Sequence, residues 1–366
     1  MDNKLINDFR RKVNENDMVC HLYYNRNGKN YWNIICSAMD WIEVVVSTID
    51  IKNLSRENNN DASVKMITFI SCVDVLWEAI QQLHRVFFST DKIPFSGDCT
   101  IFKNKLFETD DNKYFKTIRS CFAAHPINLS DYFSGGDAKE RRYAGWSGGN
   151  FGTGGFSVYL YSNCPDVKSI RMTIYFDELI RFAESRYNYL NTIMEQIDKV
   201  VSDYYSKCKK TAIPQPENIC EWIDVLMDET NKRFENDYYS YSLTKLRTIF
   251  STQITDKNNC EIVEHLRKRL IPVVNEIHDN LQNMRIADIK SLDIIEGIIP
   301  SDCQYFFSKV CEWVFGDGYE MLYGLNCYEK HLKGIVNIRN HSSITELYVL
   351  IVSGFFWIND GKVADT

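Results

Sequence analysis

The sequence lacks several patterns that would assign a function directly. It contains no C-x-x-C pair, so its 12 cysteines spell out neither a zinc knuckle nor a thioredoxin-type redox motif. Its seven histidines form no H-E-x-x-H motif and no pair spaced by four residues, so a histidine metal site has no local support. We therefore expect no cofactor and no metal ion.

Long apolar runs and an excess of positive charge are also missing. The nearest candidate for a membrane span, residues 347–357, is too short, and the N-terminal segment has no apolar core of a secretory signal. These absences predict a cytoplasmic protein with reduced, buried thiols and no membrane partner. The net charge of −7 argues against non-specific coating of nucleic acid but leaves a local binding site open.

The composition that is present is that of a globular protein with room for two domains. Of the 366 residues, 45% are apolar and 25% charged. Apolar residues recur every three to four positions over 31–51, 62–88 and 111–123, which predicts three helices, the first two forming an antiparallel hairpin around a polar loop.

A glycine-rich segment follows these helices. Residues 135–155 contain eight glycines and read as a loop. The stretches 156–161 and 167–176 alternate apolar and polar residues around the turn SNCPD, which predicts a β-hairpin. A further long helix is expected over 177–207.

Two prolines in a polar run mark residues 211–217 as a linker. We accordingly predict a domain at 1–210 with an insert at 135–176, and a second, all-α domain at 218–366. Asn218 and the pair Ser343 and Glu346 have the spacing of helix caps. The fold class is mainly α: a helical bundle with a small inserted β-hairpin, followed by a second all-α region. Helices of the second domain are expected at 240–252, 258–284 with a kink at Pro272, 301–315, 320–336 and 343–358.

The candidate catalytic residues lie in KTIRSCFAAHPINL, residues 116–129. Arg119 and His125 are six positions apart, about 120° around a regular helix, so they share no helical face. We expect the helix to stop between them, because Pro126 disfavours a helical conformation at His125.

A helical hairpin, then a helix with an arginine and a histidine separated by four to six residues, then a long helix, resembles the HEPN superfamily. RSCFAAH has five residues between Arg119 and His125, and Ser120 stands where the family usually has asparagine. The resemblance covers residues 30–208 and implies a HEPN-like four-helix unit.

The resemblance also implies metal-independent RNA cleavage. His125 would act as general acid or base, Arg119 would stabilise the charged phosphorane, and Ser120 would make a lesser contribution. It further implies a homodimer with paired motifs, and a toxin-antitoxin or anti-phage system with an antitoxin or defence partner protein.

Two other interpretations stay open. The protein could be a catalytically inert helical protein that binds a partner or a nucleic acid, with Arg119 bonding a helix end and His125 fixing a turn. A small-molecule enzyme using the glycine loop is the third, although that loop precedes a strand and lacks the context of a phosphate cradle. Candidate nucleic-acid contacts are Lys139, Arg141, Arg142, Tyr143 and Trp146.

Overall fold

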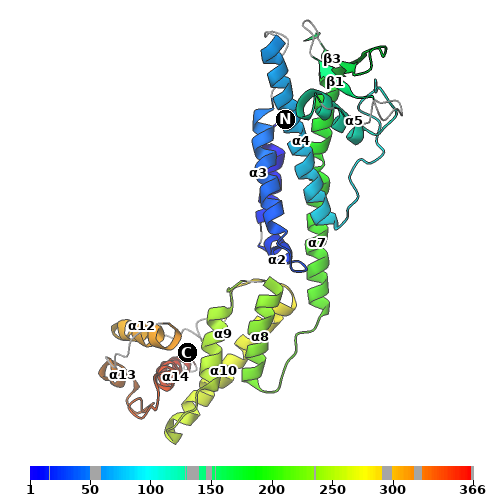
Figure 1. The fold of residues 1–366 in the computed structure, drawn as a ribbon. Coiled ribbons are helices and arrows are strands. Elements are labelled where there is room, and N and C mark those ends of the chain that lie inside the picture. The colour runs from blue at the N-terminus through cyan, green and yellow to red at the C-terminus, as the bar shows by residue number, and fades with distance from the viewer. Residues whose placement is uncertain are drawn as a thin grey trace. The chain divides into compact units, whose positions relative to one another are not determined.

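The computed structural model describes residues 1–15, 17–49, 59–127, 129, 140–145, 151–152, 154–234, 236–290, 299–316 and 324–363. The chain is mainly helical with a small antiparallel sheet inserted, as the sequence predicts (Figure 1). It divides into two compact units, Met1–Ser202 and Asp203–Thr366, with the boundary inside one long helix.

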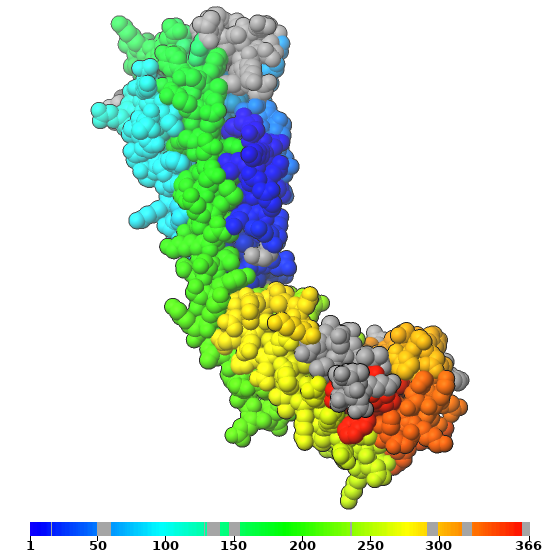
Figure 2. Space-filling view, turned by 180° about the vertical axis from the view of Figure 1, so that it is seen from behind, coloured from blue at the N-terminus to red at the C-terminus, as the bar shows by residue number. Residues whose placement is uncertain are grey.

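The first unit is built on long helices that share one apolar core. α3 and α4 pack tightly against each other, and α6 packs on α4. Figure 2 shows α6 and α7 (green) running between the N-terminal helices (blue) and the segment near residue 110 (cyan). The helices are α1 (Lys4–Asn14), α2 (Met18–Tyr24), α3 (Trp32–Thr48), α4 (Asn59–Phe88), α5 (Asp111–Arg119), α6 (Phe176–Asn188) and α7 (Leu190–Lys210).

Four of these helices differ from the expectation. α1 and α2 were not predicted, yet α1 buries Ile6, Phe9 and Val13 and so contributes to the core. The single helix expected over 177–207 is divided into α6 and α7, because the α-helical hydrogen-bond pattern is interrupted at Tyr189.

The sheet is the inserted element of the first unit. β3 pairs antiparallel with β4, which confirms the predicted hairpin, and β1 pairs with the other edge of β3. The loop predicted over the glycine-rich segment is therefore wrong in part, since that segment supplies two strands. The strands are β1 (Arg142–Gly145), β2 (Phe151–Gly152), β3 (Gly155–Ser162) and β4 (Ile170–Tyr175).

One face of the sheet closes the core. Phe156, Val158 and Leu160 of β3 and Met172 and Ile174 of β4 are buried, as the alternation of a half-buried strand requires. The residues between them face the opposite way, and this second face reaches solvent.

Among the described residues of the second unit, all regular secondary structure is helical. α10 passes Pro272 without ending there, and α14 packs along α10. The helix expected over 320–336 is shorter, although residues 320–323 lie outside the described residues. The helices are α8 (Ile219–Phe234), α9 (Ser240–Ser251), α10 (Lys257–Gln282), α12 (Ser301–Phe315), α13 (Leu325–Leu332) and α14 (Ile344–Val363).

Both predicted helix caps form, but the capping box of Ser343 and Glu346 makes only one of its two hydrogen bonds. Asn218 Oδ1 accepts from the backbone N–H of Cys220 and Glu221 at the start of α8. The Glu346 N–H donates to Ser343 Oγ over 3.1 Å, but the Glu346 carboxylate accepts from Ser342 and Thr255 instead of completing the capping box.

Residues 211–217 pack onto the second unit. The Thr211 carbonyl accepts from Arg233 Nη2 over 2.9 Å, and the Ile213 N–H donates to Gln282 Oε1 over 2.8 Å. The Ile213 side chain is buried.

The cysteines are less buried than expected. All 12 lie among the described residues and are free thiols, but only Cys121 and Cys303 are fully buried, and Cys99 is exposed. Among the described helices, none is long and apolar enough to cross a bilayer.

Candidate active site

Arg119 and His125 lie at the two ends of a π turn. Arg119 is the last residue of α5, and the chain continues through Ser120–Ala124 as a single π-helical turn, η2. The His125 N–H closes this turn on the Ser120 carbonyl, five residues back, over 3.1 Å. The helix ends at Ala124, between the two residues as expected, and His125 is non-helical with φ −140°, but before it ends the helix widens into a π turn that was not expected. π turns of this kind are frequent at functional sites.

The start of α5 is held firmly, which fixes the position of Arg119 two turns later. Asp110 caps the helix by accepting from the Lys113 N–H over 2.8 Å. The buried Asp111 carboxylate accepts from the Ile101 N–H over 2.8 Å and contacts Lys105 Nζ at 2.7 Å.

Arg119 forms an ion pair with α4. Its Nε lies 2.9 Å from Asp74 Oδ2, and its side chain remains 41% exposed, so part of the guanidinium faces solvent. Burial raises the pKa of Asp74 above its ordinary value, and the attraction of Arg119 only partly offsets that. The pair holds Arg119 in place without removing it from the surface.

Ser120 has a structural contact. Its hydroxyl donates to the Lys116 carbonyl over 3.0 Å, the pattern of a helical serine bonded one turn back. Together with its carbonyl, which accepts from His125, Ser120 fixes the π turn.

The turn is joined to the sheet from both sides. The Phe122 ring packs edge-on against Phe156 of β3, with centroids 4.7 Å apart. The carbonyl of Pro126 accepts from the Ala144 N–H of β1 over 2.6 Å, and Leu129 pairs with Arg142. The exposed His125 is thus placed directly before a segment that runs beside β1.

Of the residues predicted to contact nucleic acid, three are described. Arg141 is exposed, and Tyr143 is 37% exposed. Arg142 is buried: Nη2 contacts Glu140 Oε1 at 2.7 Å and Nη1 donates to the Leu160 carbonyl, so this side chain holds the sheet together. Lys139 and Trp146 lie outside the described residues.

Besides Tyr143, which the sequence interpretation had named, the solvent face of the sheet carries aromatic residues on β3 and β4 that it missed. The register pairs Tyr143 with Tyr161 and Tyr159 with Arg171, which places them on one face together with Tyr175. The rings of Tyr159 and Tyr161 are nearly parallel, with centroids 6.4 Å apart. The alternation already used to predict the hairpin could have identified them. We call this set the tyrosine face: Tyr143, Tyr159, Tyr161, Arg171 and Tyr175.

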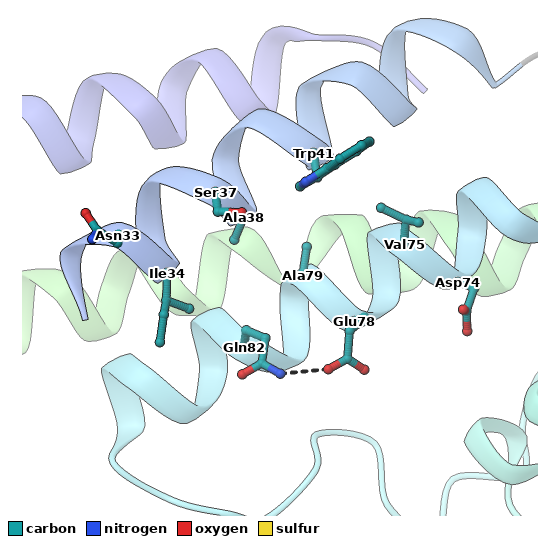
Figure 3. Close-up of a pocket in the computed structure, with 10 residues that line it drawn as sticks. All are labelled: Asn33, Ile34, Ser37, Ala38, Trp41, Asp74, Val75, Glu78, Ala79 and Gln82. Atoms are coloured by element: carbon teal, nitrogen blue, oxygen red, sulfur yellow. Dashed lines mark hydrogen bonds between the residues drawn. The ribbon is translucent and has the colours of Figure 1, made fainter. Parts of the chain in front are cut away.

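A groove runs between α3 and α4 beside the Arg119 ion pair. Figure 3 shows Trp41 and Ala38 of α3 and Val75 and Ala79 of α4 between the two helices, with Asp74 at one end. Its volume is about 530 Å³, and Trp41 is 55% exposed. The groove is lined by Asn33, Ile34, Ser37, Ala38, Trp41, Asp74, Val75, Glu78, Ala79 and Gln82.

Among the described residues around His125, no three potential metal ligands lie together. Among the described residues, the grouping of three potential metal ligands that the structure contains, Asp302, Cys303 and His331, lies in the second unit.

Comparisons with known proteins do not assign this site. No family model matches the chain, and neither curated proteins nor solved structures contain a significant match.

Proposed function

We propose that this protein is an RNA-binding, metal-independent endoribonuclease whose first unit is a HEPN-like four-helix unit. The observation that carries the proposal is the hydrogen bond from Ala144 to Pro126, which attaches the Arg119–His125 turn to the strand that opens the tyrosine face. A general acid or base, a cation and a base-stacking surface thereby belong to one connected structure.

The tyrosine face suits single-stranded RNA. Exposed rings on a small sheet stack with bases of any sequence, worth about 1–3 kcal/mol per base. Arg171 and Arg141, both exposed, supply positive charge for the phosphates beside those rings. Such local binding is compatible with a chain whose net charge is −7.

The cleavage chemistry uses the two ends of the π turn. His125 accepts the proton of the ribose 2′-hydroxyl as that oxygen attacks the adjacent phosphorus, and Arg119 stabilises the negative charge that develops on the phosphate oxygens. The leaving 5′-oxygen must gain a proton, and the His125 of a second copy supplies it in a homodimer. The products are a 2′,3′-cyclic phosphate and a 5′-hydroxyl.

The resemblance also supports a biological setting. We include in the proposal that the enzyme acts as a toxin or an anti-phage defence protein, controlled by an antitoxin or another partner protein.

The test is cleavage of total RNA by the purified protein in EDTA, with analysis of the product ends. We expect His125→Ala to slow cleavage about 10²- to 10⁴-fold, the usual contribution of a general acid or base. Arg119→Ala should slow it about 10²- to 10³-fold. The matched control is Arg181→Ala, since Arg181 is also a half-exposed arginine paired with a carboxylate, Asp177, over 3.0 Å. Equal rates for wild type, His125→Ala and Arg119→Ala, all folded by circular dichroism, would refute the enzyme.

The α3–α4 groove favours a second candidate function, binding of a helical partner protein without catalysis. An exposed tryptophan over an apolar groove is typical of protein interaction sites. A second copy of this chain seated there would also desolvate the Asp74–Arg119 pair. Light scattering on Trp41→Ser should then show loss of an oligomer, while Tyr24→Ser, which removes an equally exposed ring from α2, should not.

A further inference from the structure

Four potential metal-ligating side chains converge where α12 meets α13. Asp302 and Cys303 lie in the first turn of α12, and Cys327 and His331 lie four residues apart on one face of α13. The Cys303 and Cys327 sulfurs are 2.7 Å apart, and His331 Nε2 lies 3.0 Å from Asp302 Oδ2. The Asp302 oxygen, the Cys303 sulfur and the His331 nitrogen are all within 4.8 Å of one another.

We propose that Asp302, Cys303, Cys327 and His331 bind one zinc ion as a structural site that joins α12 to α13. Two thiolates, one imidazole and one carboxylate are a donor set that tetrahedral zinc accepts, and four protein ligands make a closed, structural site. Binding displaces the two thiol protons, while the imidazole binds in its neutral form.

The distance between Asp302 and His331 needs little change to accept the ion, whereas Cys327 has to move. With Zn–N and Zn–O bonds near 2.1 Å, a tetrahedral site separates nitrogen and oxygen by about 3.4 Å, close to the 3.0 Å between His331 and Asp302. With Zn–S bonds of about 2.3 Å, the two sulfurs would lie about 3.8 Å apart. The Cys327 sulfur, which now contacts the Asp302 backbone carbonyl at 3.3 Å and is not among the ligand atoms within 4.8 Å of one another, therefore has to change its side-chain conformation to join the site.

A neighbouring lysine can balance the net charge of the proposed zinc site. Zinc with two thiolates and a carboxylate carries a net charge of −1. Lys330 Nζ, which lies 3.3 Å from Asp302 Oδ2 and is 71% exposed, can balance that charge without competing for a position on the metal.

The packing of α12 explains what the site would do. Of the residues of α12, only Cys303 and Val310 are buried, and Tyr305 is 68% exposed. The side of α12 that faces α14 is held by aromatic packing, since Phe307 and Phe315 both contact the Tyr348 ring. A metal bridge at Asp302 and Cys303 would add a second attachment, which joins the N-terminal turn of α12 to α13.

Metal content and mass spectrometry test the proposal on the full chain, purified in reducing buffer with added zinc and then desalted. We expect about one zinc per chain for the wild type, and loss of that zinc in Cys303→Ser and in Cys327→Ser. Cys311→Ser is the matched control, because Cys311 is a half-buried cysteine on the same helix α12 but outside the cluster; it should retain the zinc.

Two further readouts keep the result interpretable if a cysteine variant fails to fold. Cobalt titration of the wild type should give the absorption bands of tetrahedral thiolate coordination, and Asp302→Ala, a change at an exposed residue, should weaken cobalt binding by at least about tenfold. A wild type without zinc, zinc retained by every variant, or a Cys303–Cys327 disulfide located by peptide mass mapping of protein purified without reductant, would each overturn the proposal. Because EDTA would remove this zinc, the ribonuclease assay is repeated without chelator.

Discussion

One buried charged residue from each unit, Arg186 of the first and Glu346 of the second, is stabilised in a different way. In the first unit, Arg186 is completely buried among aromatic rings, with its Cζ 3.9 Å from the centroid of Phe182 and 4.5 Å from that of Phe95. Its Nη2 donates to Asn112 Oδ1 over 2.8 Å. Burial lowers the pKa of Arg186 to about 10, although Asp111 nearby favours the charged form.

The second unit buries Glu346 among hydrogen-bond donors instead. Its carboxylate accepts from the N–H and hydroxyl of Ser342 and from the N–H and hydroxyl of Thr255, over 2.6 to 2.9 Å. Burial alone would raise the pKa of Glu346, but these hydrogen bonds outweigh burial and lower it.

This difference follows from the two side chains. A guanidinium can be held by the electron-rich faces of aromatic rings, whereas a carboxylate only accepts hydrogen bonds and needs donors around it. Loss of the Arg186 side chain should therefore leave a cavity, and loss of the Glu346 charge should leave hydrogen-bond donors without a good acceptor.

The largest expected effect is that of Arg186→Ala. Removing this side chain leaves a cavity between the rings of Phe95, Phe182 and Trp77 and leaves Asn112 Oδ1 without its donor, and should lower the free energy of unfolding by about 4 kcal/mol. Arg186→Met keeps most of the volume and should cost about half as much. Denaturant unfolding measures both, and equal losses would show that the charge, not the packing, stabilises this site.

Glu346→Gln should lower the free energy of unfolding by about 2 kcal/mol, because an amide nitrogen would then face a hydrogen-bond donor. Glu312→Gln on the exposed face of α12 is the control. The pKa of Glu346 is lowered by folding, so its contribution is present above its unfolded pKa and is lost as the pH falls through the folded value. A flat difference between wild type and variant over acidic pH would contradict this.

Asp74→Asn should show the opposite pH dependence with a smaller effect, under about 1 kcal/mol, because the Arg119 pair is partly exposed. The pKa of Asp74 is raised by folding, so its contribution is greatest below the unfolded pKa and is lost as the pH rises through the folded value. Denaturant unfolding from acidic to neutral pH, compared with Glu346→Gln, distinguishes the two signs. The same sign for both variants would refute the assigned causes.

Gly145→Ala should change stability least, by about 0.5 kcal/mol, since a strand accepts alanine. Its Cβ would, however, overlap the Tyr161 ring and would displace that exposed ring from the tyrosine face. We expect single-stranded RNA to bind about fivefold more weakly. Gly154→Ala, where the added Cβ meets nothing within 4 Å, is the control in a binding titration. Equal affinities would argue against stacking on Tyr161.

The long elements could be predicted from the sequence because their periodicity reports burial directly. Apolar residues at helical spacing located α3, α4, α9, α10 and α12, and strict alternation located β3 and β4. The strand β1 could not be predicted, because glycine-rich sequence carries no alternation, and its pairing depends on β3.

The candidate sites were predictable only in part. The positions of Arg119 and His125 were chosen from their spacing, but spacing does not reveal the π turn or the partner Asp74, which comes from another helix. The proposed zinc ligands escaped because Cys303 and Cys327 are separated by 23 residues. The four-residue spacing of Cys327 and His331 on α13 was the local signal that could have pointed to them.

The π turn between Arg119 and His125 can also be described as a shift of helical phase. An α-helix rotates by about 100° per residue, so one surplus residue in a turn changes the direction of every side chain after it. Here the surplus residue allows Phe122 to stay locked on Phe156 while His125 emerges at the surface. A chain shortened by one residue within Ser120–Ala124 would have to give up one of these two orientations, which makes the length of this segment as important to the site as its sequence.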